Sequence, residues 1–444
     1  MRGQAQRSQD RAAAKSLAVV QELLQDYHPR DFAVALWDGT QLPPDPGQFC
    51  RFTWQINNPG ALRALLRSDR QVALGEAYAS GDFDISGDIL AIFPLAEHLA
   101  EKHWATAKKL RLASLLLGLP ATAHHEELIA DLTGRSHSKL RDRNAVTFHY
   151  DVSNEFYKLW LDRGLVYSCA YFKTPEDPLD AAQEQKLDYI CRKLRLRPGQ
   201  RMLDLGCGWG GLILHAARNY GVQATGITLS EQQLMLAQQR IEEAGLASQC
   251  QVTLMDYRDA RQLGDFDKIA SVGMVEHVGE SQLPEYFGNA FALLKPGGAF
   301  LNHGIGRGGN RAKPSHPTFT DVYVFPDGEM IPIATMLRRA EEAGFEVRDV
   351  ENLREHYFLT LCQWLRRLEA SEEQAQALVG EARYRIWRLY LAGSAYYFRT
   401  GKLDLYQSLL VKSGHGGSEL PLTRDDWYRT DRSVPRDNPR QLAC

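Results

Sequence analysis

The chain has 444 residues, a formal net charge of −3 and 24% charged residues, which is ordinary for a globular protein. This length allows two domains with a large core, and the small net charge gives no global field that would indicate a nucleic-acid partner. Seven scattered cysteines without a C-x-x-C pair argue against a disulfide framework or a zinc site, and the histidines form no H-E-x-x-H motif. The sequence therefore predicts reduced thiols, no metal and no bound nucleic acid.

The first part of the chain predicts a small α+β unit. Residues 1–14 are expected to be disordered and show no apolar signal-peptide core. A helix is predicted over 15–26, a strand over 49–56, and another helix from Pro59. The longest apolar run, 112–119, is much shorter than the roughly 20 residues that a membrane-spanning helix needs. We therefore expect a protein that does not cross a membrane.

An amphipathic helical tract is predicted over residues 89–117, beside a cluster of Lys and Arg side chains. Such a tract can pack its apolar face on a neighbouring domain, or it can lie on an anionic bilayer surface. The polar residues that follow have the composition of a linker. The expected domain organisation is an N-terminal lipid-associated domain at 1–120, a linker at 121–143, a catalytic domain at 144–412 and a mobile tail at 413–444.

Strands and helices alternate through the catalytic part. The predicted strands are 201–205, 223–228, 251–255, 268–272 and 299–303. This alternation predicts a doubly wound, Rossmann-like α/β fold with a parallel sheet covered by helices on both faces. Residues 354–398 are strongly helical and are expected to form an insertion before a last strand at 403–412.

A glycine-rich turn follows the first of these strands, at residues 206–211. Gly206, Gly208 and Gly211 also fit the G-x-G-x-x-G pattern of dinucleotide sites, but that site needs an acid at the end of the second strand. No carboxylate stands there. Asp204 before the first glycine and Asp256 after the third strand form instead the arrangement of S-adenosylmethionine (SAM) methyltransferases.

Each part of SAM has a candidate partner in this arrangement. Gly206 and Gly208 allow close approach of the backbone, and Thr228 and Gln233 can reach ribose hydroxyls. Adenine needs a flat neighbour and an acceptor for its amine, which Tyr257 and Asp256 can supply. Gln233 and Tyr257 have plain structural alternatives, as a solvated helix residue and a core residue.

Several stretches together resemble one family, the cyclopropane-fatty-acyl-phospholipid synthases and their mycolic-acid-modifying relatives. The matching stretches are 150–157, 167–172, 205–210, 226–230, 276–277 and 356–357, with 58–59 and 75–78 upstream. The upstream part resembles the N-terminal domain of the bacterial phospholipid enzymes, which implies intact phospholipid as substrate and a cytoplasmic, peripheral location at the inner face of the membrane. The oligomeric state is left open, a homodimer included.

The resemblance implies transfer of the SAM methyl group to a cis double bond of an acyl chain, giving a carbocation that loses a proton to a bound bicarbonate ion as a cyclopropane ring closes. The residues that match the bicarbonate holders are Cys169 and Ile305, through backbone amides, with Glu276, His303 and Tyr357. Further cofactor contacts are implied for Tyr167, Ser168, Leu229 and Arg258. Each bicarbonate holder also has a structural alternative, such as a core histidine or a packed tyrosine.

One residue departs from the family pattern: Ser394 stands where many relatives carry cysteine, so a catalytic thiol there is excluded or the activity is altered. Three rival functions stay open. The cation can rearrange to a methylene- or methyl-branched chain. The enzyme can be an N- or O-methyltransferase for small polar acceptors, although 271–277 lacks the Asn/Asp-Pro-Pro-Tyr run of amino-group enzymes. The basic helices can also belong to a lipid-surface module without catalysis.

Overall fold

A computed structural model gives the structure of the protein. It describes residues 2–66, 69–101, 106–117, 119, 129, 132–150, 152–309, 316–414, 417–418 and 420–428. The chain divides into two compact units. The first unit contains residues 1–130 together with two later segments, 314–326 and 372–396, and the second contains 131–313, 327–371 and 397–444. Each unit is described by itself.

The first unit is built on a four-stranded sheet of order β2-β1-β3-β4, in which β1 and β3 are parallel. Its elements are α1 (Arg2–Leu24), β1 (Phe32–Leu36), β2 (Gln41–Leu42), β3 (Phe52–Ile56), η1 (Pro59–Leu66), α2 (Arg70–Ala79), β4 (Phe83–Gly87), η2 (Ile89–Ile92), α3 (Phe93–Glu101), α4 (Thr106–Leu117), α12 (Phe319–Tyr323), α15 (Glu372–Val379) and most of α16 (Glu381–Arg399). The prediction of disorder over 1–14 was wrong, because α1 begins at Arg2.

The two later segments are held in the first unit by specific contacts. Arg385 on α16 donates hydrogen bonds to the carbonyl oxygens of Tyr78 (2.7 Å) and Phe83 (2.7 Å). Gly75 on α2 faces the ring of Phe319, and a Cβ at that position would lie 2.0 Å from a ring carbon. The segment predicted as one helical insertion, 354–398, is thus divided: α14 (Arg354–Ala370) lies in the second unit, and residues 372–396 lie in the first.

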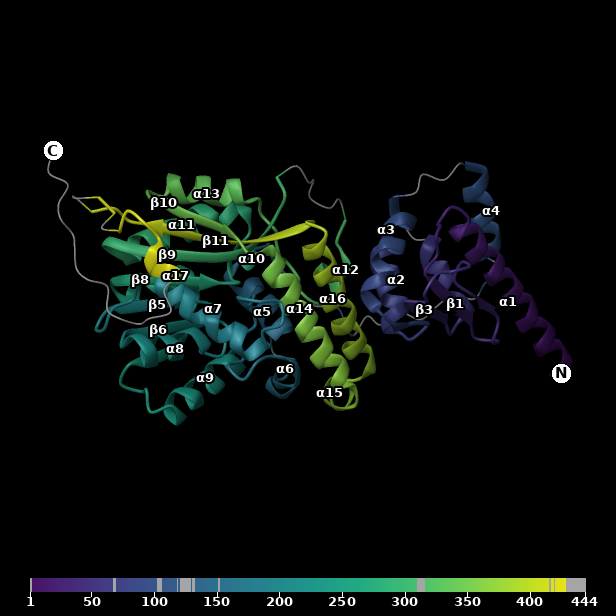
Figure 1. Ribbon diagram of the computed structural model, residues 1–444, viewed down its shortest axis with the longest axis horizontal. Coiled ribbons are helices and arrows are strands. Elements are labelled where there is room, and N and C mark those ends of the chain that lie inside the picture. Colours follow the sequence, from purple (N-terminus) through teal and green to yellow (C-terminus); the bar gives the residue numbers. More distant parts are fainter. Residues whose placement is uncertain are drawn as a thin grey trace. The chain divides into compact units, whose positions relative to one another are not determined.

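The second unit contains a seven-stranded sheet of order β10-β11-β9-β8-β5-β6-β7 (Figure 1). Its strands are β5 (Arg201–Leu205), β6 (Gln223–Thr228), β7 (Cys250–Leu254), β8 (Phe266–Val272), β9 (Leu294–Arg307), β10 (Glu346–Asn352) and β11 (Leu403–Val411). The five strands predicted to be parallel are parallel, and β11 runs antiparallel to both β9 and β10. The Rossmann-like α/β fold predicted from the alternation is confirmed.

Helices cover both faces of this sheet. The helices of the unit are α5 (Lys139–Tyr150), α6 (Asn154–Trp160), α7 (Leu179–Lys193), α8 (Gly211–Tyr220), α9 (Glu231–Glu243), η4 (Tyr257–Leu263), α10 (Val275–Val278), η5 (Glu280–Gln282), α11 (Leu283–Leu293), α13 (Ile333–Glu342), α14 and α17 (Asp425–Tyr428). One core joins the sheet to α7, α8 and α9, and a second joins the opposite face to α11 and α13 (Figure 1). Within the described residues, no helix combines the length and apolarity needed to span a bilayer.

Two segments differ from the predicted organisation. Residues 139–143, expected in the linker, begin α5 in the second unit. Part of the expected mobile tail is packed, since Trp427 is only 2% exposed and Arg195 is paired with Asp426 at 2.7 Å. Residues 429–444 of that predicted tail lie outside the described residues.

Candidate active site

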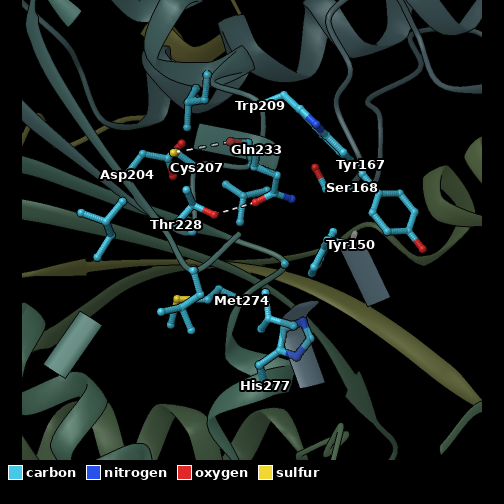
Figure 2. Close-up of a pocket in the computed structure, with 18 of the residues that line it drawn as sticks. Tyr150, Tyr167, Ser168, Asp204, Cys207, Trp209, Thr228, Gln233, Met274 and His277 are labelled. Carbon is cyan, nitrogen blue, oxygen red and sulfur yellow. Dashed lines mark hydrogen bonds between the residues drawn. The ribbon is translucent and has the colours of Figure 1, made fainter. Parts of the chain in front are cut away.

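A cavity lies at the carboxyl ends of β5, β6 and β8, where ligands bind in open α/β sheets (Figure 2). Its walls come from strand ends, from the loop before α7, and from α5 and α7. All of the residues that line it belong to the second unit. The cavity therefore lies where the glycine turn and the following helix were predicted to meet a ligand.

The glycine turn forms the base of this cavity. Gly206 and Gly208 have φ angles of 80° and 54°, in the left-handed region that side chains disfavour. The backbone amides of Gly206 and Cys207 donate to the carbonyl oxygen of Ile227 at 3.1 and 2.9 Å, which fixes the turn against β6. A Cβ at Gly206 would lie 3.1 Å from the Met274 side chain. The turn thus exposes backbone to the cavity at a point where little side-chain volume is available.

Two polar side chains after β6 are joined to each other. The Thr228 hydroxyl donates to Gln233 Oε1 at 2.6 Å, and both residues are buried and line the cavity (Figure 2). Ser230 begins α9 by accepting a hydrogen bond from the Gln233 amide at 3.2 Å. This cap fixes Gln233 in the first turn of α9, where its side-chain amide lies beside the Thr228 hydroxyl.

A buried network lies at the end of the next strand in the sheet, β7. Arg258 donates to both carboxylate oxygens of Asp256, at 2.7 and 2.6 Å, and to Asp142 Oδ2 at 2.9 Å. Its ion pairs raise the pKa of Arg258, so the guanidinium stays charged. Asp256 is therefore already engaged by Arg258, while it and Tyr257 still line the cavity.

All eleven predicted cofactor residues line this one cavity. They are Tyr167, Ser168, Asp204, Gly206, Gly208, Thr228, Leu229, Gln233, Asp256, Tyr257 and Arg258. Sequence reasoning missed several other lining residues, among them Asp142, Tyr150, Lys186, Trp209 and His277. His277 is buried, and desolvation lowers its pKa to about 3, so its imidazole is neutral. Tyr150, Trp209 and His277 fall in stretches that match the family, whereas Asp142 and Lys186 fall in none, and their positions depend on tertiary packing.

The five predicted bicarbonate holders do not line this cavity. Two of them are in direct contact: the backbone amide of Ile305 donates to Glu276 Oε1 at 2.7 Å. Glu276 is 2% exposed, its Oε2 has no hydrogen-bond partner, and burial raises its pKa to about 7. The Ile305 amide predicted to hold an anion is thus already bonded to the neighbouring carboxyl.

His303 lies two residues earlier on β9, opposite Gln407 of β11. Its Nδ1 is 3.0 Å from Gln407 Nε2, and its Nε2 has no partner. The side chain is 1% exposed, and burial together with Lys186 and Lys193 lowers its pKa well below the usual value. His303 is therefore neutral, and Gln407 fixes the orientation of its ring.

Cys169 and Tyr357 both contact the carbonyl oxygen of Leu353, just before α14. Cys169 Sγ lies 3.9 Å from the carbonyl oxygen of Leu353, which also accepts the Tyr357 amide at 3.1 Å. Cys169 is fully buried, and desolvation raises its thiol pKa, so it is no thiolate nucleophile. Tyr357 packs against Phe398 with ring centroids 4.5 Å apart. These contacts join Glu276 to Ile305, and they join Cys169 and Tyr357 to one carbonyl, that of Leu353, whereas the side-chain partner of His303 is Gln407.

Comparison with known proteins identifies the family. The family model described as mycolic acid cyclopropane synthetase matches residues 137–408, more than half of the chain. The chain belongs to this family. A model described as a domain of unknown function matches residues 19–108.

Individual relatives extend this result over most of the chain. A "probable fatty acid methyltransferase" of Pseudomonas putida is 41% identical and covers 93% of this chain and 100% of its own. The cyclopropane-fatty-acyl-phospholipid synthase of Escherichia coli K12 is 33% identical over 82% of this chain and 88% of its own. The structure of mycolic acid cyclopropane synthase CmaA1 complexed with SAH and CTAB is 34% identical, with a TM-score of 0.57, and covers 60% of this chain and 97% of that chain.

Family membership confirms the predicted class. The second unit has the class I SAM methyltransferase fold, and the chain carries a separate small N-terminal domain besides it. The protein is a SAM-dependent methyltransferase of the mycolic acid cyclopropane synthetase family. The cavity beside the glycine turn suits the cofactor, because it combines an exposed backbone turn, buried hydroxyl and amide groups, and a buried carboxylate with an unpartnered oxygen.

Proposed function

We propose that the protein transfers the methyl group of SAM to a cis double bond in an acyl chain of a phospholipid and closes a cyclopropane ring. The observation that carries this proposal is Glu276, a buried carboxyl group whose Oε1 accepts from the Ile305 amide of β9 while its Oε2 has no hydrogen-bond partner. Proton removal inside an apolar site needs such an installed group. Family membership and the cofactor cavity supply the other support.

The roles of the residues follow from their chemistry. SAM supplies an electrophilic methyl group on a positively charged sulfur. The residues around the glycine turn would bind and orient it, because an alkene is a weak nucleophile and must meet the methyl group in line. Bond formation to one alkene carbon leaves a cation on the other. Loss of a proton from the added methyl group then provides the electron pair that closes the ring.

A bicarbonate ion is the proposed acceptor of this proton, and part of its predicted site fits. Glu276 Oε2 and His303 Nε2 are buried polar atoms without partners, which is expected where a small hydrogen-bonding ion belongs. A neutral His303 with its proton on Nε2 can donate to an anion, while Glu276 can accept from its hydroxyl. Cys169 and Tyr357 would complete the site. The Ile305 amide would join it only after release from Glu276.

The second candidate product is a methylene-branched chain, reducible to a methyl branch. The Pseudomonas putida relative is named a probable fatty acid methyltransferase, a name that specifies no ring. A hydride shift would move the cation to the methyl-bearing carbon before proton loss. Both products have the same mass, since each gains the methyl group and loses one proton, a net gain of CH2.

The decisive experiment incubates the full chain with SAM and vesicles of a phospholipid that carries cis mono-unsaturated chains, followed by proton NMR of the released fatty acids. Ring protons at high field support cyclopropane formation. Vinylidene protons would establish the branched alternative and overturn ring closure. Turnover of a soluble amine or alcohol, with the vesicle lipid unchanged, would overturn the lipid substrate altogether.

A further inference from the structure

The stretches 167–172 and 356–357 both match the family, and they meet in the structure. The backbone amide of Phe172 donates to Nδ1 of His356, in the first turn of α14, at 3.0 Å. The imidazole of His356 also stacks on the ring of Tyr171, with ring centroids 4.7 Å apart and an interplanar angle of 12°. The side chain of His356 therefore holds the end of the segment that carries the predicted site residues of the first stretch.

Thr360 lies one helical turn further along α14 and holds the same segment. Its hydroxyl oxygen accepts from the backbone amide of Ala170 at 3.0 Å, and its hydroxyl donates to the carbonyl oxygen of His356 at 2.7 Å. Both Thr360 and Ala170 are fully buried. Because a buried amide without a partner is unfavourable, the Thr360 hydroxyl is well suited to fix this part of the backbone.

The fixed amides of this segment stand next to one that is free. The amide of Tyr171 donates to the carbonyl oxygen of Ala182 on α7 at 3.0 Å, so the three amides of residues 170–172 all have partners. Within the described part of the chain, the backbone amide of Cys169 donates no hydrogen bond, although Cys169 is fully buried. Buried backbone amides are nearly always paired, so a free one is expected where a ligand supplies the acceptor.

The bond from Phe172 also fixes the protonation state of His356. A protonated imidazole carries a hydrogen on both nitrogens, so Nδ1 accepts only in the neutral tautomer with its proton on Nε2. Burial lowers the pKa of His356, against the opposing effect of Glu351 and Glu355. His356 is thus a neutral acceptor, and any residue that replaces it in this role needs an acceptor atom at the same place.

We propose that His356 and Thr360 are positioning residues, which hold the segment 169–172 so that the Cys169 amide stays available to the bicarbonate ion. The inference rests on the proposed function, in which this amide is one of the donors. Tyr357, another proposed member of the bicarbonate site, lies between the two positioning residues on α14. One helix would therefore set two donors of the site, a backbone amide and a phenol, relative to each other.

Two matched pairs of variants separate the hydrogen bonds from side-chain packing. Thr360→Val keeps the shape of the side chain and removes the hydroxyl, whereas Thr360→Ser keeps the hydroxyl. His356→Phe keeps a ring over Tyr171 and removes the acceptor, whereas His356→Asn supplies an oxygen acceptor near the position of Nδ1. The first member of each pair should disturb the segment, and the second member should rescue it.

The test follows the Cys169 amide by proton–nitrogen NMR of the full chain with isotope-labelled cysteine. Cys169→Ala identifies the resonance by its absence. Bicarbonate is added at constant pH in the presence of S-adenosylhomocysteine (SAH), and the wild-type resonance should shift. Thr360→Val and His356→Phe should need about tenfold more bicarbonate or greater for half of this shift, because a small misplacement of a donor is costly. Thr360→Ser and His356→Asn should stay within about threefold of the wild type, a difference of less than 1 kcal/mol.

A positioning role also differs from a general loss of structure in its effect on the two ligands. Thr360→Val should raise the bicarbonate concentration for half-maximal turnover and keep the SAH affinity, measured by calorimetry, within about threefold of the wild type. Equal losses for both ligands would overturn the positioning role. If thermal melting shows that neither Thr360→Val nor His356→Phe folds, the wild type decides, and a Cys169 resonance that does not respond to bicarbonate would overturn the inference.

The outcomes separate this inference from the proposed function. Equal bicarbonate titrations in the wild type, Thr360→Val and His356→Phe overturn the role of the two residues and leave the proposed function intact. The expected titrations together with vesicle lipid that gains no methyl carbon would overturn the proposed function, while they would support the positioning of the Cys169 amide.

Discussion

The backbone amide of Ile305 donates a hydrogen bond of 2.7 Å to Oε1 of Glu276, so one oxygen of this buried carboxyl group is fixed while the other, Oε2, has no partner. This hydrogen bond joins β9 to α10, and it fixes the position of the free Oε2. A glycine at 304 permits this approach, because a Cβ there would lie 2.2 Å from the Val275 side chain. The local backbone is therefore shaped to bring this carboxyl group against the strand end.

Glu276→Gln tests the role of this group in the reaction. The amide keeps the size of the side chain and an acceptor for the Ile305 amide, but it cannot be ionised. We expect product formation to fall about 10²-fold or more, in the range of general-base losses, with SAH affinity nearly unchanged. Turnover on unsaturated phospholipid vesicles and calorimetry with SAH measure the two quantities. Glu285→Gln, at an exposed position on α11, is the control. Unchanged turnover in Glu276→Gln would remove this residue from the reaction.

The pH dependence of stability provides a second test at the same residue. Burial raises the Glu276 pKa from 4.5 to about 7 in the folded chain, so the folded state holds this proton more tightly than the unfolded state. The resulting stabilisation is complete below about pH 4.5 and is lost as the pH rises through 7. Over this window Glu276→Gln should gain stability relative to the wild type by roughly 3 kcal/mol, because each pKa unit corresponds to about 1.36 kcal/mol.

Urea unfolding of both proteins at several pH values between 4 and 8 measures this difference. Glu285→Gln should follow the wild type across the series, because its side chain is exposed. A constant offset between Glu276→Gln and the wild type at every pH would contradict the raised pKa of Glu276.

Gln407 is expected to act through His303. Its side-chain amide is the partner of His303 Nδ1, and it does not line the cofactor cavity. Gln407→Leu should leave the imidazole free to change its tautomer or rotate, and lower turnover about tenfold or more with SAH affinity retained. Gln407→Glu should raise the pKa of His303 by placing a carboxylate at Nδ1.

Nitrogen NMR of the imidazole distinguishes this positioning role from a general loss of stability. The wild type should show a single neutral tautomer, Gln407→Leu a mixture, and Gln407→Glu a protonated ring at neutral pH. The same single tautomer in all three proteins would show that Gln407 does not orient His303.

The parts of the structure that were predictable from sequence are those governed by local pattern. β5 and β6 were predicted residue for residue, because β5 ends at the glycine turn and β6 ends just before the Ser230 cap of α9. β10 was not predicted: its sequence, EVRDVEN, is largely polar, and the strand exists because it pairs with β11. Residues 2–14 are polar but rich in Ala, Gln and Arg, good helix formers, so polarity alone was a poor guide to disorder there.

The residues of the candidate site also divide into those that could be predicted from sequence and those that could not. The glycine turn and the residues after each strand could be placed because the ends of parallel strands meet at one edge of a sheet. Lys186 could not, since in sequence it is one more charge on an amphipathic helix, and only the packing of α7 turns it toward the cavity. Asp142 was missed for the same reason, because it lies in a segment that was predicted to be a linker and is part of α5.

The glycine turn itself allows a test of geometry against a matched position. Gly206 and Gly199 both have a φ of 80°, but a Cβ at Gly206 would lie 3.1 Å from Met274, whereas a Cβ at Gly199 would have no neighbour within 4 Å. Alanine at Gly199 should therefore cost only the strain of the left-handed backbone, about 1–2 kcal/mol of unfolding free energy. Alanine at Gly206 should cost more and should also weaken SAH binding tenfold or more, because the added methyl group enters the base of the cavity. Urea unfolding and calorimetry on both variants give the comparison. Equal stability losses and unchanged SAH affinity in the two variants would show that the turn at Gly206 does not contact the cofactor.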